Sequence, residues 1–146
     1  MYRKGGDFDL AIADFTKAVE LDPQYYWAFG ERGQAYKEQG KPDLAIADFT
    51  KAIELYADYA WAYAERGNVY RERGDFDQAI ADFTKAIEIY PEYSWAYRQR
   101  SLAYRLSGKY DNAAADYYAQ FPGREGFPKF PSLLIQLWKI TDFFRF

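Results

Sequence analysis

The sequence predicts an all-α fold, a solenoid built from stacked pairs of antiparallel helices. The first observation behind this prediction is a repeat, because the string AIADFTKA begins at residues 11, 45 and 79, each copy 34 residues after the last. The second is the helical spacing of apolar residues inside every copy. The third is a glycine that stands shortly before each copy, at Gly6, Gly40 and Gly74, where the preceding helix is expected to end. No alternating apolar and polar run, which would indicate a strand, lies outside these helical segments.

The chain enters this array partway through a unit. Residues 1–4 match only the last turn of a first helix, so the helix expected at about 7–21 lacks its partner. A single unit cannot bury its apolar face alone. We therefore expect Phe8, Ile12, Phe15 and Val19 to be partly uncovered.

Each complete unit is expected to contain two helices, which in the first complete unit run at about 26–39 and 42–55. Gly40 stands where the first of these helices should end, as helix C-terminal caps do. Pro42 suits the first turn of the second helix, where its missing N–H costs nothing. The later units repeat this plan until Pro122 and Gly123 stop the last helix early.

The repeat resembles the tetratricopeptide repeat. That family's pattern has a large residue, a small residue four positions later and a tyrosine, followed by alanine, an aromatic residue, alanine and proline. Successive units of this sequence supply Phe29, Gly33, Tyr36, Ala45, Phe49 and Ala52, then Tyr63, Gly67, Tyr70, Ala79, Phe83, Ala86 and Pro91, then Tyr97, Ser101, Tyr104, Ala113 and Tyr117. The resemblance implies a right-handed superhelix whose concave face binds peptides or protein segments.

These features divide the chain into a repeat array at 1–121, a linker and a C-terminal segment. The array comprises a half repeat at 2–25, complete repeats at 26–59 and 60–93, and a degenerate repeat at 94–121. A linker rich in proline and glycine follows at 122–131, and an apolar helix is expected at 132–146.

Charged residues recur where the family usually has leucine. These are Arg32, Arg66 and Arg100 in the first helices, while Asp14, Asp48, Asp82 and Asp116 recur in the second helices. We interpret them as repeated arginine–aspartate pairs between packed helices rather than as catalytic groups.

Composition argues against several classes of function. The 146 residues include no cysteine and no histidine, so thiolate chemistry is excluded and the commonest metal ligand and general base are missing. No glycine-rich phosphate loop is visible either. We therefore expect no enzyme activity, no cofactor and no metal. A net charge of -3 argues against nucleic-acid binding. No secretory signal or membrane span is visible, which favours a cytoplasmic protein.

The stripe of each first helix that faces away from the core is the candidate binding groove for a protein or peptide. It combines polar side chains with a tryptophan at the start of each helix, and tryptophan can either anchor a partner or pack between units. Gly30, in mid-helix, either permits the close approach of a ligand or is a neutral substitution. The lysine and asparagine clamp of chaperone-binding members is poorly matched, so their ligand is not expected. The groove residues are Trp27, Glu31 and Gln34, then Trp61, Glu65, Asn68 and Arg71, then Trp95, Arg98, Leu102 and Arg105.

The C-terminal segment is apolar on nearly every side of the helix expected there, and such a helix is normally buried on more than one side. Three interpretations remain open: a cap on the last unit, a segment lying in the groove, or pairing with another chain. Pairing would make the protein a self-assembling structural module and a homo-oligomer, which is the alternative to a binding scaffold. The residues expected to self-associate are Phe8, Ile12 and Phe15 with Leu134, Leu137, Trp138 and Phe143.

Overall fold

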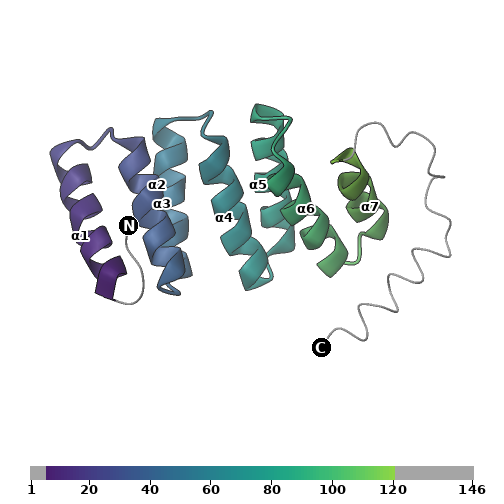
Figure 1. Cartoon of the computed structure of the whole chain (residues 1–146), viewed down its shortest axis with the longest axis horizontal. Helices are drawn as coiled ribbons and strands as arrows, with labels where there is room; N and C mark the ends of the chain where they lie inside the picture. Colours follow the sequence, from purple (N-terminus) through teal and green to yellow (C-terminus); the bar gives the residue numbers. More distant parts are fainter. Residues whose placement is uncertain (1–5, 121–146) are drawn as a thin grey trace.

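The computed structural model describes residues 6–120, and that part of the chain contains seven α-helices and no strand. The helices lie side by side in a row from α1 to α7 (Figure 1). This arrangement confirms the prediction of an all-α solenoid. The helix expected at 132–146 lies outside the described residues. The seven helices are α1 (Gly6–Leu21), α2 (Tyr26–Glu38), α3 (Pro42–Leu55), α4 (Ala60–Arg73), α5 (Phe76–Ile89), α6 (Ser94–Leu106) and α7 (Tyr110–Ala119).

The helices pack in pairs, α2 with α3, α4 with α5 and α6 with α7, and each pair also packs on its neighbour. In addition, α2 touches α4 and α4 touches α6, whereas the second helices of neighbouring units have no comparable contact. The first helices therefore lie on the inner side of the curved row. This places their outward-facing stripe on the concave face of the array.

Glycines end the first helices, as the sequence predicts. Gly40, Gly74 and Gly108 have φ angles of 71°, 85° and 79°, the left-handed region that favours glycine because it has no Cβ. Pro42 begins α3, whose bounds are those expected, and α2 ends one residue earlier than expected, at Glu38.

Phenylalanine rings from the second helices form the centre of the core. Phe49 and Phe83 are both 0% exposed. Each ring lies close to a glycine of the paired first helix, and a Cβ added at Gly67 would lie 3.1 Å from Cε1 of Phe83. The small residue of the repeat pattern is therefore needed because two helices approach closely at this point.

Three arginine–aspartate pairs expected from the sequence, those of Arg32, Arg66 and Arg100, are confirmed. Arg66 of α4 donates from Nε and Nη2 to the two carboxylate oxygens of Asp82 on α5, each at 2.8 Å. Its Nη1 also donates to Thr50 of α3, in the preceding unit, at 2.9 Å. Each arginine thus joins three helices. The same arrangement holds Arg32 with Asp48 and Thr16, and Arg100 with Asp116 and Thr84.

Candidate binding groove

Three rows of side chains cross the first helices on the concave face. Equivalent positions in α2, α4 and α6 are 34 residues apart, so each row presents one residue from each helix. The first row is mainly acidic, the middle row carries side-chain amides, and the third row is basic. The rows are Glu31, Glu65 and Gln99, then Gln34, Asn68 and Leu102, then Lys37, Arg71 and Arg105.

The basic row of one helix meets the acidic row of the next. Nζ of Lys37 on α2 lies 2.5 Å from Oε2 of Glu65 on α4, and the two side chains are only 14% and 12% exposed. Such a shielded pair fixes the position of both charges. It also shows which side of α2 faces the following unit.

Glu31 lies in the same part of the groove as Glu65. Burial raises the pKa of the Glu31 carboxyl above its ordinary value, and the negative charge of Glu65 raises it further. The groove at α2 and α4 therefore favours a cationic or N–H donor group close to these carboxyls.

The middle row contains hydrogen-bonding atoms in a buried setting. Asn68 accepts a hydrogen bond from Nη2 of Arg71 at 2.7 Å and donates to Glu72 at 3.2 Å. Gln34 donates to Glu38, but its Oε1 is buried without a hydrogen-bond partner in the part of the chain that the structure describes. The Nε atom of Arg71 is also buried without a hydrogen-bond partner among the described residues. An acceptor and a donor of this kind suit the amide groups of a polypeptide backbone.

Tyr59 and Tyr93, which are not among the groove residues expected from the sequence, also border the groove. The pKa of Tyr93 is raised to about 12, mainly by burial and then by the charge of Glu65. Burial also raises the pKa of Tyr59, with a further contribution from Glu31. Both hydroxyls therefore lie within the electrostatic reach of the acidic row. The sequence could have placed Tyr59 and Tyr93 at the groove, because they are 34 residues apart, the same spacing as that between equivalent groove residues.

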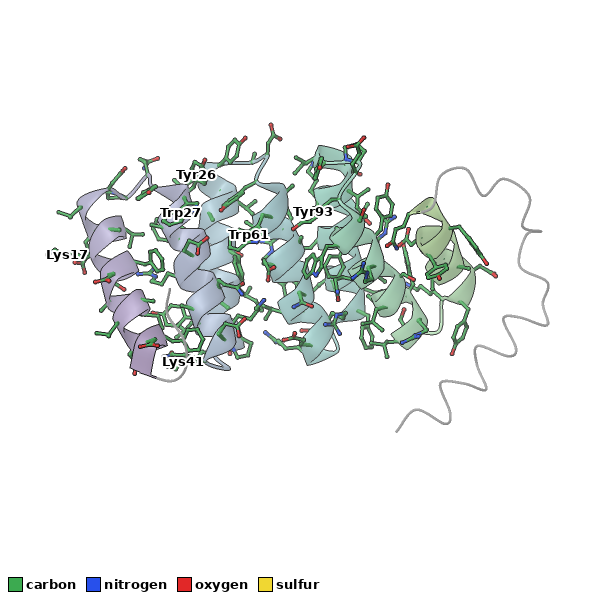
Figure 2. All side chains as sticks on the ribbon, viewed as in Figure 1. Lys17, Tyr26, Trp27, Lys41, Trp61 and Tyr93 are labelled. Atoms are coloured by element: carbon green, nitrogen blue, oxygen red, sulfur yellow. The ribbon has the colours of Figure 1, made fainter. Side chains whose placement is uncertain are left out.

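The tryptophans of the expected groove pack between units. The ring centroid of Trp61 lies 5.8 Å from that of Phe49 on α3, in an edge-to-face contact. Trp95 packs in the same way on Phe83, and Trp27 on Phe15. Trp61 and Trp95 pack against the two core clusters, so they belong to the contact between units. Trp27 is 43% exposed, and Figure 2 shows it in the equivalent place one unit earlier.

Gly30 has a different role from the one that the sequence suggested. A Cβ at this position would lie 2.9 Å from Cζ3 of Trp61 and 3.3 Å from Cε1 of Tyr59. The close approach is therefore made by rings of the following unit and not by a ligand.

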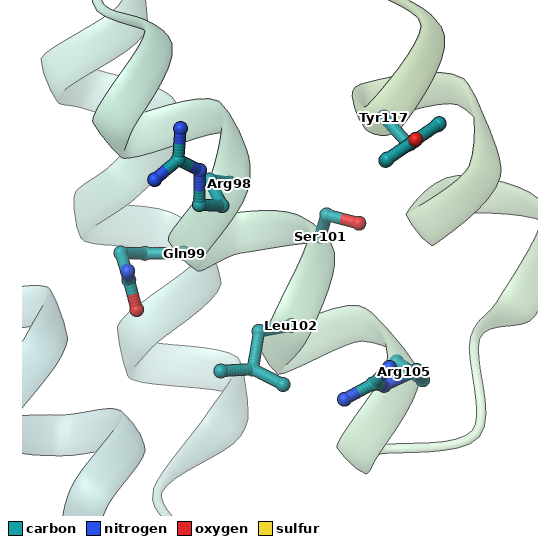
Figure 3. Close-up of a pocket in the computed structure, with 6 residues that line it drawn as sticks. All are labelled: Arg98, Gln99, Ser101, Leu102, Arg105 and Tyr117. Atoms are coloured by element: carbon teal, nitrogen blue, oxygen red, sulfur yellow. The ribbon is translucent and has the colours of Figure 1, made fainter. Parts of the chain in front are cut away.

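The groove ends in a pocket of about 270 Å3 between α6 and α7. Figure 3 shows the α6 side chains on one side of this pocket and Tyr117 of α7 on the other. It contains three of the expected groove residues, Arg98, Leu102 and Arg105, and Gln99 and Ser101 complete its lining.

Only some of the residues expected to self-associate lie within the described residues 6–120. Phe8, Ile12 and Phe15 of α1 are half-buried, and Phe15 packs on Trp27. Leu10, on the same helix, is 61% exposed. The C-terminal members of the set, Leu134, Leu137, Trp138 and Phe143, lie outside the described residues.

Between residues 6 and 120, no cluster of three or more histidine, cysteine, aspartate or glutamate side chains is arranged to hold a metal ion. Within the same range, no helix has the length and apolar character needed to span a membrane.

Comparison with protein families matches the repeats. The tetratricopeptide repeat model matches residues 26–59 and 60–93, and a second TPR repeat model matches residues 1–40. No curated protein matches the sequence.

Solved structures show the same architecture. The crystal structure of the MamA protein is 30% identical, with a TM-score of 0.76, and the match covers 86% of this chain and 72% of that one. The second TPR domain of Spaghetti (RPAP3), bound to the HSP90 peptide SRMEEVD, is 26% identical with a TM-score of 0.65, covering 70% of this chain and 95% of that one. The Arabidopsis OM64 TPR domain is 25% identical with a TM-score of 0.65, covering 80% and 92%.

Proposed function

The chain belongs to the tetratricopeptide repeat family, whose general role is protein–protein interaction, and we propose that its groove holds an extended segment of a partner protein. The observation that carries this proposal is a pair of buried polar atoms, Oε1 of Gln34 in the middle row and Nε of Arg71 in the basic row, which have no hydrogen-bond partner in the described chain. A buried polar atom is costly unless it is satisfied, and a backbone amide of a partner would satisfy it.

The charged rows further define the partner segment. The carboxyl of Glu31, whose charge is disfavoured by burial and by the nearby Glu65, favours a cationic side chain on one side of the bound segment. Arg71, whose Nε has no hydrogen-bond partner in the described chain, favours an acidic one on the other side. A structural relative, the second TPR domain of Spaghetti (RPAP3), is bound to a peptide, which supports a peptide-binding role for this chain. The clamp residues of chaperone-binding members are poorly matched here, so a different ligand is expected. We propose a binding role and no catalytic step.

A peptide display experiment tests the proposal. Peptides of random sequence are selected on the full chain, and the affinity of each selected peptide is then measured for Asn68→Ala and Glu65→Gln. Loss of a central hydrogen-bonding residue of an interface weakens binding by about tenfold or more, so this is the effect we expect.

Gln78→Ala is the matched control, because Gln78 is an exposed amide on α5, away from the concave face. It should leave the affinities unchanged. The proposal is wrong if no peptide is selected, or if the selected peptides bind both groove variants as tightly as the unaltered chain while the variants remain folded by circular dichroism.

Self-assembly is the second candidate function, and it stays a prediction. The exposure of Leu10 and the half-buried side chains Phe8 and Ile12 leave apolar surface on α1 that another chain could cover. Light scattering of the full chain at increasing concentration measures this directly. A mass that stays at one chain, 17.1 kDa, would reject it.

A further inference from the structure

The loops that join one unit to the next lie along one edge of the array (Figure 1). We call this surface the tyrosine edge and define it by residues 20–26, 54–60 and 88–94. These segments contain six of the chain's 15 tyrosines and six of its 22 acidic residues, but none of its 19 basic residues. All six carboxylates and four of the six tyrosines are exposed. The edge is therefore an aromatic surface with a concentrated negative charge.

Ring contacts hold the tyrosines of the edge in place. The ring centroid of Tyr26 lies 4.8 Å from that of Tyr56 and 5.1 Å from that of Tyr59, both in the following loop. In the next loop, the centroids of Tyr90 and Tyr93 are 5.8 Å apart. Tyr56 and Tyr90 nevertheless remain 43% and 50% exposed. The rings thus form a preorganised surface that a partner can still contact.

Two turns of the edge place an acidic residue between two tyrosines, at residues 56–59 and 90–93. In each turn the N–H of the last tyrosine donates to the carbonyl oxygen of the first, at 3.2 Å and 3.0 Å. The acidic residues are Asp58 and Glu92, and neither has an ion-pair partner among residues 6–120. By contrast, the last acidic residues of α3 and α5 pair with lysines of their own helices. Each turn therefore offers an uncompensated carboxylate beside exposed rings.

The array already holds arginine between a ring and a carboxylate. The guanidinium of Arg66 lies 5.7 Å from the ring centroid of Tyr63 while it donates to both carboxylate oxygens of Asp82. The guanidinium is planar, so it can stack on a ring and bind a carboxylate at the same time. The ammonium of lysine is compact and strongly hydrated, which makes it a poorer match for a ring. The chemistry of the two turns therefore selects arginine.

We propose that the tyrosine edge binds an arginine-bearing segment of a partner protein, with one guanidinium stacked on the tyrosines of each turn and paired with Asp58 or Glu92. This surface is separate from the rows of the groove, and the proposal does not depend on the function proposed for them. Packed helices lie about 10 Å apart, and an extended chain advances roughly 3.3 Å per residue. Two arginines about three residues apart would therefore reach both turns.

The first loop of the edge lacks the complete pattern. Asp22 stands where the later turns have their first tyrosine, and Gln24 stands where they have the acidic residue. The carboxylate of Asp22 accepts a hydrogen bond from the backbone N–H of Gln24 at 3.0 Å, so it is already engaged in its own turn. This loop contributes Tyr26, which packs on the following turn. The binding surface therefore centres on the second and third loops.

Fluorescence anisotropy with the full chain tests the inference. The probe is a labelled synthetic peptide with arginine at every third position, separated by glycine and serine. The same peptide with lysine should bind at least about threefold more weakly. Tyr56→Leu with Tyr90→Leu should weaken binding of the arginine peptide by about tenfold, since an exposed cation–π contact contributes about two- to fivefold. Tyr56→Phe with Tyr90→Phe keeps both rings and should leave the affinity unchanged.

The carboxylates are tested in the same way. Asp58→Asn with Glu92→Gln should weaken binding of the arginine peptide by about threefold or more. Asp77→Asn with Asp111→Asn is the matched control, because it removes two charges from the opposite edge of the array, where α5 and α7 begin. The groove variant Asn68→Ala should also leave this affinity unchanged, which separates the edge from the groove.

Circular dichroism checks that each variant array remains folded. The inference is overturned if the arginine peptide does not bind, or if the lysine peptide binds equally well. It is also overturned if the charge control weakens binding as much as Asp58→Asn with Glu92→Gln. Loss of binding in Asn68→Ala, with binding retained in the leucine variant, would assign the peptide to the groove and reject the edge.

Discussion

Glu31 holds a negative charge where the folded chain disfavours it. Its pKa is raised, first by burial and then by Glu65, so the folded protein binds the Glu31 proton more tightly than the unfolded chain does. The stability that this proton contributes is fully present below the ordinary glutamate pKa. It is lost as the pH rises through the raised value. A residue that costs stability at neutral pH is a reasonable candidate for a binding role.

Replacing Glu31 with glutamine should therefore stabilise the protein near neutral pH, because it removes the charge and keeps the shape. The gain in the free energy of unfolding should shrink as the pH falls. It should vanish below about pH 4.3, the ordinary glutamate pKa, because Glu31 is then protonated in both the folded and the unfolded state. Urea denaturation across a pH series measures it. Glu54→Gln, an equal change on an exposed residue of α3, is the control. A variant less stable than the unaltered chain at neutral pH would contradict this account.

At the level of the helix, hydrogen bonds from Arg32, Arg66 and Arg100 join each first helix to the second helix of its own unit and to that of the preceding unit. Arg66 connects α4 to α5 through Asp82 and to α3 through Thr50. The side chains of Arg66 and Asp82 are 17% and 9% exposed, so removal of one partner leaves the other charge shielded from water. The family usually has leucine at this position, which indicates that an apolar contact can serve in place of the ion pair.

Arg66→Leu alone should destabilise the protein by about 3 kcal/mol, because Asp82 is left buried and uncompensated. Arg66→Leu together with Asp82→Ala should recover most of that loss. Denaturant unfolding gives both values. Arg73→Leu is the matched control, since Arg73 pairs with Asp43 and Asp75 at an exposed site and should change stability by about 0.5 kcal/mol or less. A double variant no more stable than the single one would show that Asp82 is not the cause.

The helices themselves could be predicted because their signals are local. The bounds of α3 follow from Pro42 and the apolar spacing, and Gly40 ends the preceding helix. The arginine–aspartate pair was also predictable, since both residues recur with the same register. The role of Gly30 was not, because the ring that approaches it comes from Trp61, and the angle at which one unit stacks on another decides that contact. Gln34 could be placed on the groove stripe, but its unsatisfied oxygen depends on the side chains packed around it.

Across the whole molecule, stability depends on contacts between neighbouring units. A solenoid has no single central core, so an interior unit is held on two sides and an end unit on one. Trp61 contacts Phe49 and Tyr59 and covers Gly30 of the preceding unit. Trp27 packs on α1 through Phe15 and is 43% exposed.

Trp61→Ala should accordingly cost about 3 kcal/mol, near the lower end for a buried aromatic residue, and Trp27→Ala about 1 kcal/mol. The two variants control for each other, because the same side chain is removed from equivalent positions. Thermal and denaturant unfolding, with peptide affinity measured in parallel, test the difference. If Trp61→Ala kept its stability and lost peptide binding, Trp61 would be an anchor for a partner and the packing role assigned here would be wrong.

The direct contact of α2 with α4 and of α4 with α6 has a consequence for the sequence of a partner. Packed helices lie about 10 Å apart, and an extended chain advances roughly 3.3 Å per residue. About three residues of an extended segment, if bound as proposed, would therefore pass each first helix. In a segment lying along one row, every third side chain would meet the equivalent residue of the next first helix. The spacing between the first helices would place equivalent side chains of the ligand about three residues apart, just as the repeat places equivalent residues of the array 34 apart.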